Sequence, residues 1–300
     1  MFSYRYMNMA MNGILSGTQR EDKSDVFVNY LMAPNKMRMD MHMLMAMYGI
    51  SNRFTVMAMV NYNINTMQMD MFDMNGHVHP GMTTTMHMNH EMKTSGLGDT
   101  KLHLLYGLIK RVNHQLLLSA GISIPTGNFQ IKGKNDDAMY PDKRLPYSMQ
   151  LGSGTFDVLP CINYVYQKEK IALSIQGSGI IRTAYNDIGY NLGNEATVSG
   201  WFSYQWLRFL SSSVRLEGNA ASAIDGYDPT LYYFNEPSSN PHNYGGQRLS
   251  CYIGSVLQFK KRSIKNNRFG IEYGFPFYQS SNGTQMQLKQ TLNASWSVSF

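Results

Sequence analysis

The sequence has 300 residues, a formal net charge of +6 and 15% charged residues, against roughly 25% in typical soluble domains. Its mean hydropathy is −0.32, and no run nears the roughly 20 apolar residues of a membrane helix, which argues against a helical membrane protein. Lysine and arginine are scattered and form no basic stripe, so nucleic acid is not an expected partner.

Alternation of polar and apolar residues with a period of two is the main pattern, and it predicts β-strands. In chain order, the predicted strands lie near residues 2–12, 37–48, 54–62, 99–108, 115–123, 156–166, 171–178, 197–206, 214–219, 248–258, 269–277 and 285–300. Most approach the roughly 9–11 residues with which a tilted strand crosses a membrane. The pattern therefore predicts about twelve strands, an even number, as is usual for bacterial barrels.

The first three predicted strands are rich in methionine, and their polar residues indicate which face points inward. In the second strand Arg38, Asp40 and His42 alternate with methionines. We therefore expect these polar side chains to face the interior and the methionines of 37–47 to face lipid. In the first and third strands the methionines share a face with polar residues, which predicts an inward orientation. These inward methionines are Met7, Met9, Met11, Met57 and Met59.

The last predicted strand has the clearest alternation and ends on an aromatic residue, Phe300. One parity is mostly apolar and includes Leu292 and Trp296, whereas the other carries serine, threonine, asparagine and lysine. Such a strand resembles the terminal strand of outer-membrane proteins, which the barrel-assembly machinery recognises. The resemblance implies that this machinery is a partner, and that the lipid bilayer and lipopolysaccharide surround the protein.

The connections between the predicted strands alternate in length. Those near 49–53, 109–114, 167–170, 207–210 and 260–266 are short, and those near 13–36, 63–96, 125–153, 182–195 and 222–246 are long. Short turns on one side and long loops on the other are typical of bacterial outer-membrane barrels. A soluble β-sandwich of this length would need two domains and a linker, and no break in composition marks one.

The predicted fold class is therefore all-β, a single antiparallel transmembrane β-barrel of about 12 strands (range 10–14). We expect one domain over residues 1–300, located in the bacterial outer membrane, with short periplasmic turns and long extracellular loops.

Ten charged or titratable side chains are expected to face the lumen, because a basic residue facing lipid at mid-bilayer costs about 2–4 kcal/mol. Opposite charges on neighbouring strands are expected to cross-link the interior, with contact to a solute as the alternative role. These candidate lumen residues are Arg5, Asp99, Lys101, His103, Asp157, Arg215, Glu217, Arg248, Glu272 and Lys289.

Methionine forms a second pattern, since 21 of the 24 methionines precede residue 93 and histidines are interleaved with them. Thioether and imidazole ligands together suit Cu(I), Cu(II) or silver. A Met/His-rich extracellular loop over 63–96 is therefore a candidate site for a copper or silver ion, and no other cofactor is expected. The alternative is that methionine merely serves as an apolar strand residue. The candidate ligands are Met67, Met69, Met71, His77, His79, Met86, His87, Met88 and His90.

Short glycine motifs occur where long loops return to strands. They are Gly-Leu-Gly-Asp-Thr-Lys-Leu at 96–102, Ile-Pro-Thr-Gly at 124–127 and Leu-Gly-Ser-Gly-Thr-Phe-Asp at 151–157. With the closing strand, they resemble the outer-membrane transporter family named after the phenol meta-cleavage degradation pathway (MetA-pathway), over most of the chain. The resemblance implies transport of small, often hydrophobic molecules, but carries over no site residues. The glycines themselves suit backbone bends and bulges.

Three functions follow from these patterns. The first is an outer-membrane transporter or channel for a small molecule. The alternatives are a copper- or silver-handling barrel and a structural or assembly-partner barrel with a plugged lumen. An enzyme is not expected, because there is no nucleophile-elbow motif and the histidines cluster with methionine.

Overall fold

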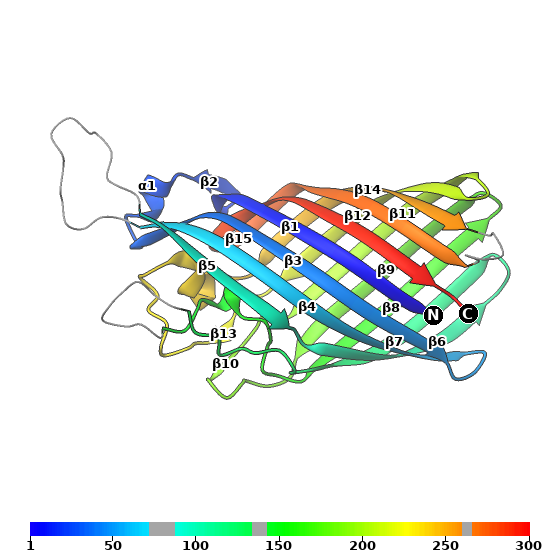
Figure 1. The fold of residues 1–300 in the computed structure, drawn as a ribbon, viewed down its shortest axis with the longest axis horizontal. Helices are drawn as coiled ribbons and strands as arrows, with labels where there is room; N and C mark the ends of the chain where they lie inside the picture. Colours follow the sequence, from blue (N-terminus) through cyan, green and yellow to red (C-terminus); the bar gives the residue numbers. More distant parts are fainter. Residues whose placement is uncertain (72–87, 134–142, 260–265) are drawn as a thin grey trace.

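The computed structural model describes residues 1–71, 88–133, 143–259 and 266–300. Among these residues, eleven strands form one closed antiparallel barrel in which each strand pairs with the next along the ring (Figure 1). The ring strands are β1 (Phe2–Gly17), β3 (Met32–Gly49), β4 (Phe54–Met71), β6 (Thr100–Lys110), β7 (His114–Ile124), β8 (Asp157–Lys168), β9 (Ile171–Arg182), β11 (Glu195–Leu207), β12 (Leu210–Ala221), β14 (Gly246–Phe259) and β15 (Asn267–Val298).

The remaining elements are not strands of the ring. Strand β2 (Gln19–Glu21) pairs with β1, β5 (Met88–Leu97) pairs with β4, and β10 (Tyr190–Asn191) pairs with β13 (Asp225–Gly226). The helices are short: α1 (Lys23–Val26), η1 (Tyr147–Met149), η2 (Pro237–Ser239) and η3 (Pro241–Asn243). Among the described residues, no helix is long and apolar enough to cross a membrane.

Strand β15 closes the ring and doubles back on itself. It pairs with β14 through its first half, 267–281, and with β1 through its second half, 281–298. The halves bond to each other, because Gln279 and Leu288 exchange two hydrogen bonds of 3.0 and 3.1 Å and Trp296 Nε1 donates to Asn267 Oδ1 at 2.7 Å. Counted as continuous elements in the described part of the chain, the ring has eleven strands, which lies within the predicted range without confirming twelve.

The two ends of the barrel differ. Both termini lie at one end, which we call the turn end (Figure 1); there the Met1 amino group donates to Met47 O at 3.0 Å and the rings of Phe2 and Phe300 meet at 5.8 Å. The connections 50–53, 111–113, 169–170 and 208–209 at this end are short. The opposite end, which we call the loop end, carries α1, β2, β10 and β13 (Figure 1). The predicted alternation of short and long connections is therefore present.

Side-chain alternation gives the wall an apolar outer face and a polar inner face. On β9, for example, Ile175 is 55% exposed on the outside whereas its neighbour Ser174 is buried. Exposed leucine, isoleucine, valine and phenylalanine recur at alternate positions on the other ring strands. An apolar exterior around a polar interior suits a barrel surrounded by lipid.

Strand β3 departs from the prediction, because its methionines point inward and its polar residues point outward. Leu44 is 64% exposed, and Asp40 shares its parity, whereas Met37 is buried inside the barrel. The expectation that the methionines of 37–47 face lipid is therefore wrong. The register places Asp40 beside Asn8 of β1 and His42 beside Tyr6.

A hydrogen-bonded network explains how these polar groups are tolerated on the outer face. Asp40 Oδ1 accepts from Tyr6 Oη at 2.5 Å, Asn8 Nδ2 at 2.8 Å and Arg38 Nη2 at 3.0 Å. His42 Nδ1 and Tyr4 Oη form a further hydrogen bond of 2.8 Å. Partners on the neighbouring strand therefore offset the cost of exposing these groups on an apolar surface.

The predicted Met/His-rich loop is shorter in the structure than 63–96. Strand β4 continues to Met71, and β5 begins at Met88, with paired positions from Tyr62–Leu97 to Met71–Met88. Residues 72–87 lie outside the described part of the chain.

Substitution with arginine at two neighbouring positions of β9 tests the assigned faces. We expect Ile175→Arg to lower the free energy of unfolding by about 2–4 kcal/mol, because the charge would face lipid. Gln176→Arg, whose side chain faces the interior cavities, serves as the matched control and should have a smaller effect. The measurement is urea unfolding in lipid vesicles, and the reverse ranking would contradict the assigned faces.

Candidate functional site

Two adjoining cavities occupy the interior of the barrel. One, of about 540 Å³, is lined mainly by polar residues of β1, β11, β12, β14 and β15, and we call it the polar cavity. The other, of about 450 Å³, is lined in part by Met45, Met47, Met57 and Met59, and we call it the methionine cavity. Gln176, Ser178 and Thr197 line both, so the cavities are continuous along this wall.

Arg215 on β12 organises the charges of the polar cavity. Its Nε and Nη2 donate to the two carboxylate oxygens of Glu272 at 3.0 and 2.7 Å, and it also pairs with Glu217. The guanidinium carbon lies 3.8 Å from the centre of the Tyr252 ring, and Tyr252 Oη donates to Glu217 at 3.2 Å. Bidentate and stacked contacts of this kind fix an arginine in one orientation. They cross-link β12, β14 and β15.

A segment between β7 and β8, residues 143–154, lies inside the ring at the loop end, and we call it the plug loop. A third cavity, of about 170 Å³, lies between this loop and the wall and is lined by Lys101, Asp157 and Tyr147, among others. It shares Lys101 and Leu159 with the methionine cavity. The plug loop therefore covers the lumen from the loop end.

Asp99 anchors the plug loop to the wall. Its Oδ1 accepts from Gly127 N at 3.0 Å, and its Oδ2 accepts from Ser153 N at 2.8 Å and Ser153 Oγ at 2.7 Å. A carboxylate with this many donors is well satisfied at a partly buried position. The predicted lumen residue Asp99 therefore joins Gly127 to Ser153, two positions of the connection between β7 and β8.

Asp157, where the chain enters β8, forms a second anchor. Arg182 Nη1 donates to Asp157 Oδ2 at 2.5 Å, and Thr155 Oγ1 donates to Asp157 Oδ1 at 2.7 Å. Both members of the ion pair are buried, so the removal of Arg182 alone would leave the Asp157 carboxylate as an uncompensated buried charge. Arg182 has a second acidic partner, Glu195, at 3.7 Å.

Methionines hold the inner side of the plug loop against β3, β4 and β5, in a cluster that we call the methionine core. Met149 of η1 and Met69 of β4 are each 0% exposed, and Thr94 Oγ1 donates to Met149 O at 2.9 Å. The unbranched, flexible side chain of methionine suits an irregular contact of this kind. The core contains five buried methionines, Met37, Met67, Met69, Met92 and Met149, and four partly buried ones, Met11, Met32, Met39 and Met286.

Tyrosines from different loops pack together at the loop end and connect these loops to one another. Tyr147 packs edge-on against Tyr190 at 4.9 Å and Tyr244 at 5.7 Å. Asp228 N donates to Tyr147 Oη at 2.9 Å, and Arg144 pairs with Asp228 at 2.5 Å. Burial raises the pKa of Tyr190 to about 12, so its hydroxyl group stays protonated at physiological pH.

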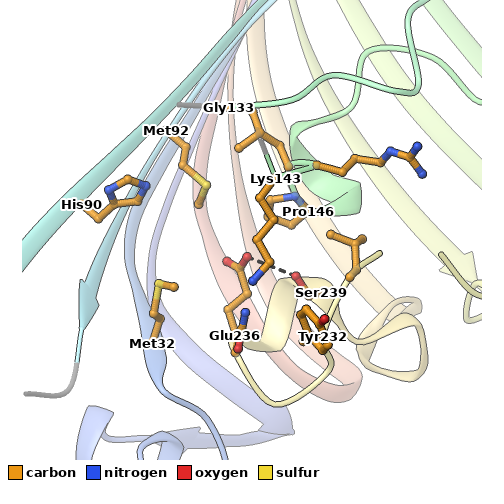
Figure 2. A pocket seen from close by; sticks show the side chains of 13 residues that line it. Met32, His90, Met92, Gly133, Lys143, Pro146, Tyr232, Glu236 and Ser239 are labelled. Carbon is orange, nitrogen blue, oxygen red and sulfur yellow. Dashed lines mark hydrogen bonds between the residues drawn. The ribbon is translucent and has the colours of Figure 1, made fainter. Parts of the chain in front are cut away.

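A small cavity of about 30 Å³ lies at the edge of these loops (Figure 2). Met32 of β3 and His90 and Met92 of β5 lie on one side of it, and Lys143 and Glu236 lie on the other (Figure 2). Ser239 Oγ donates to Glu236 Oε1 at 3.1 Å. Burial raises the pKa of the Glu236 carboxyl group.

The candidate lumen residues fall into several groups. Arg5, Arg215, Glu217 and Glu272 line the polar cavity. Lys101 and His103 line the methionine cavity. Asp99 and Asp157 are the two anchors described above.

Two candidates lie apart from these groups. Arg248 lies on β14 opposite Asn219 and Gln279 and lines none of the three cavities. Lys289 lies at a bulge, because the register passes from Ala10–Gln290 to Met11–Leu288; its side chain is exposed and donates to Gln287.

The candidate metal ligands are spread over several environments. Met67 and Met69 belong to the methionine core, His90 lines the small cavity, and Met71 and Met88 pair at the ends of β4 and β5. His77, His79, Met86 and His87 lie outside the described residues. In the described part of the chain, no group of three or more His, Cys, Asp or Glu is placed to hold a metal ion.

Sequence reasoning missed Arg182, Tyr252 and Met149. Arg182 and Tyr252 have partners on other strands, and nothing in their own segments indicates these contacts. The motif at 151–157 was a signal for the plug loop, because Gly152 packs directly on Gly127: a Cβ at Gly152 would lie 2.3 Å from Gly127 O.

Comparisons with known proteins show the fold but no family. No family model and no curated protein matches the chain. An outer membrane channel from Pseudomonas putida has a TM-score of 0.61 at 12% identity, covering 98% of this chain and 93% of that one. A FadL homologue from Pseudomonas aeruginosa (TM-score 0.47, 9% identity, 98% and 89% covered) and the Ralstonia pickettii toluene transporter TbuX (0.47, 8%, 99% and 90%) are less similar.

The closed barrel and its apolar outer face indicate where in the cell the protein lies. A closed antiparallel barrel satisfies its backbone hydrogen bonds within the wall, and its apolar outer face matches the bilayer core. The outer membrane channel from Pseudomonas putida shares this fold. The protein is located in the bacterial outer membrane.

Replacement of Gly152 by alanine tests whether the plug loop limits passage through the lumen. The added methyl group would clash with the backbone of Gly127 and should weaken docking by about 1–3 kcal/mol. We expect a higher single-channel conductance in planar bilayers. Gly49→Ala at the turn end, where a Cβ meets nothing within 4 Å, is the matched control; equal conductance in the two variants would argue against a gating role.

Proposed function

We propose that the protein is a channel or transporter for a small molecule across the outer membrane. The observation that supports this most directly is the pair of adjoining cavities, of about 540 and 450 Å³, inside a closed barrel. A barrel with a purely structural role would be expected to fill its interior with side chains. The interior here is filled only in part.

The cavities form a series that suggests a route for the solute. The cavity under the plug loop shares Lys101 with the methionine cavity, and the methionine cavity shares Gln176 and Thr197 with the polar cavity. The polar cavity reaches Gly270 and Val256 toward the turn end. The plug loop lies at the other end of this series, which is the position of a gate.

The orientation in the membrane completes the proposal. The long loops face the outside of the cell and the short turns face the periplasm, as in bacterial barrels generally. Each half of β15 crosses the membrane once, which makes twelve crossing segments. The half that leads to Phe300 is recognised by the barrel-assembly machinery, and lipopolysaccharide contacts the outer surface near the loop end. The eight candidate lumen residues other than Arg248 and Lys289 act on the solute or on the plug loop.

Electrical recording of the purified protein in planar bilayers tests the proposal. We expect discrete single-channel steps of low conductance, because the plug loop narrows the lumen. The control is the same preparation after heat denaturation. A folded barrel that stays electrically silent, and that admits no small solute in a liposome-swelling assay, would support the alternative of a structural or assembly-partner barrel.

Soft-metal handling is a second candidate function, favoured by one observation. Met32, His90 and Met92 line the same small cavity, and thioether with imidazole is a ligand set for Cu(I) or silver (Figure 2). The cavity is small enough for an ion, and it adjoins the methionine core.

Calorimetric titration of the whole protein with Ag⁺ tests the metal alternative. We expect micromolar or tighter binding, weakened by the double change His90→Ala and Met92→Leu, which removes two donors while keeping the apolar volume of Met92. Met286→Leu, in the methionine core but outside the small cavity, is the control. The absence of micromolar binding by the unmodified protein would exclude this function.

A further inference from the structure

We propose that the lumen contains a binding site for a small organic anion with an apolar body, such as an aromatic or short-chain carboxylate, and that Arg5 binds its carboxylate. This inference rests on the proposed function, because it names the class of solute for the same lumen. Three observations support the site: in the described part of the chain Arg5 has no acidic side chain within ion-pair distance, the acids of the polar cavity are paired with Arg215, and the adjoining cavity is lined by methionines.

Arg5 faces the polar cavity with its guanidinium group available. It lies on β1 opposite Ser295 and Met43, neither of which is acidic, and it remains exposed to the cavity. Among the described residues, no acid lies within ion-pair distance of Arg5. A guanidinium group presents a fork of N–H donors that matches a carboxylate.

The acids of the polar cavity are already paired with other groups. Glu272 receives both hydrogen bonds of the Arg215 fork and a third from Asn293 at 3.2 Å. Glu217 pairs with Arg215 and accepts from Tyr252 and from Ser199. The lining of the cavity thus holds two cations and two anions, and both anions bind the same cation. Arg5 is the cation left for an incoming anion.

The rest of the polar cavity offers further hydrogen-bond donors to a bound molecule. Its lining includes Ser178, Thr197 and Ser213, whose hydroxyl groups can donate, and Trp201, whose indole adds an apolar surface with one N–H donor.

The adjoining methionine cavity suits the apolar part of such a molecule. Met45 and Met47 of β3 and Met57 and Met59 of β4 line it, together with leucines of β6, β7 and β8. Methionine adapts to ligands of different shapes. Because the two cavities share lining residues, a molecule with its carboxylate at Arg5 can place its body among the methionines.

The inward-facing methionines of β3 suit this arrangement. If they faced lipid, any apolar side chain would serve. In the lumen they provide an apolar wall opposite a charged one, and the solute class that fits both walls is an amphipathic anion.

Current block by a matched pair of compounds tests the site. We expect benzoate to reduce the single-channel current of the unmodified protein, while benzamide, of the same shape but uncharged, should block much less. In Arg5→Gln the apparent affinity for benzoate should fall by about tenfold or more, because a charge-assisted bond is lost. Arg5→Lys keeps the positive charge but lacks the fork of N–H donors, so its apparent affinity for benzoate should lie between those of the unmodified protein and Arg5→Gln.

Two further variants test the role of the methionine cavity and the effect of a cation outside the lumen. Met59→Ser should weaken block by benzoate but leave block by acetate, which lacks an apolar body, unchanged. Arg208→Gln, in the turn between β11 and β12, removes a cation outside the lumen and should leave both compounds unaffected. Heat-modifiable migration on gels verifies that each variant is folded.

The outcomes distinguish this site from the proposed function. A conducting channel in which benzoate blocks Arg5→Gln as well as the unmodified protein, or in which benzamide blocks equally, would overturn the anion site and leave the channel function intact. If the barrel conducts no current, the channel function is contradicted. Binding of benzoate is then measured by quenching of Trp201 fluorescence in the double variant Trp206→Phe and Trp296→Phe. Quenching that depends on Arg5 would support the site, and its absence would overturn it.

Discussion

The pairing of β1 with the second half of β15 is the interaction on which the rest of the structure depends. In hydrocarbon an unpaired backbone N–H or C=O costs several kcal/mol, so a sheet can reside in a membrane only if it has no edge. The ladder from Phe2–Val298 to Gly17–Ser281 removes both edges. Once the ring is closed, the alternation of side chains assigns each residue to lipid or to the interior, and every feature of the lumen follows from that assignment.

The interior is divided between a region that holds the loops and a region that remains hollow. At the loop end, Asp99 and the Asp157–Arg182 pair fix the C-terminal end of the plug loop, while the methionine core fills the space behind it. Below it, the wall carries charges on one side and thioethers on the other. The same residue type thus has two roles: nine methionines act as packing around the loop, and others form an apolar wall beside open space.

The sequence was sufficient to predict the barrel and the alternation of connection lengths, because these depend on local patterns of strand and turn residues. It was not sufficient for β3, since alternation shows that a strand has two faces but does not show which one meets lipid. That choice depended on Tyr6 and Asn8 of β1, which satisfy Asp40 on the outside. Lys289 was misplaced because a bulge, invisible in the pattern, changes the parity of the strand. The anchoring role of Asp99 depends on backbone N–H groups of Gly127 and Ser153, which are distant in sequence and carry no pattern of their own.

The closing ladder also determines how the chain must fold. Phe2 and Val298, which pair, are separated by 296 residues, so the contact that completes the ring is among the most non-local that this chain can form. Such contacts form slowly, because a long stretch of chain loses conformational entropy before the hydrogen bonds that offset this loss can form. Until then both flanking strands expose free edges that invite pairing with other chains. The lifetime of the open sheet, more than the stability of the finished barrel, therefore determines how much of this protein reaches its native state without assistance.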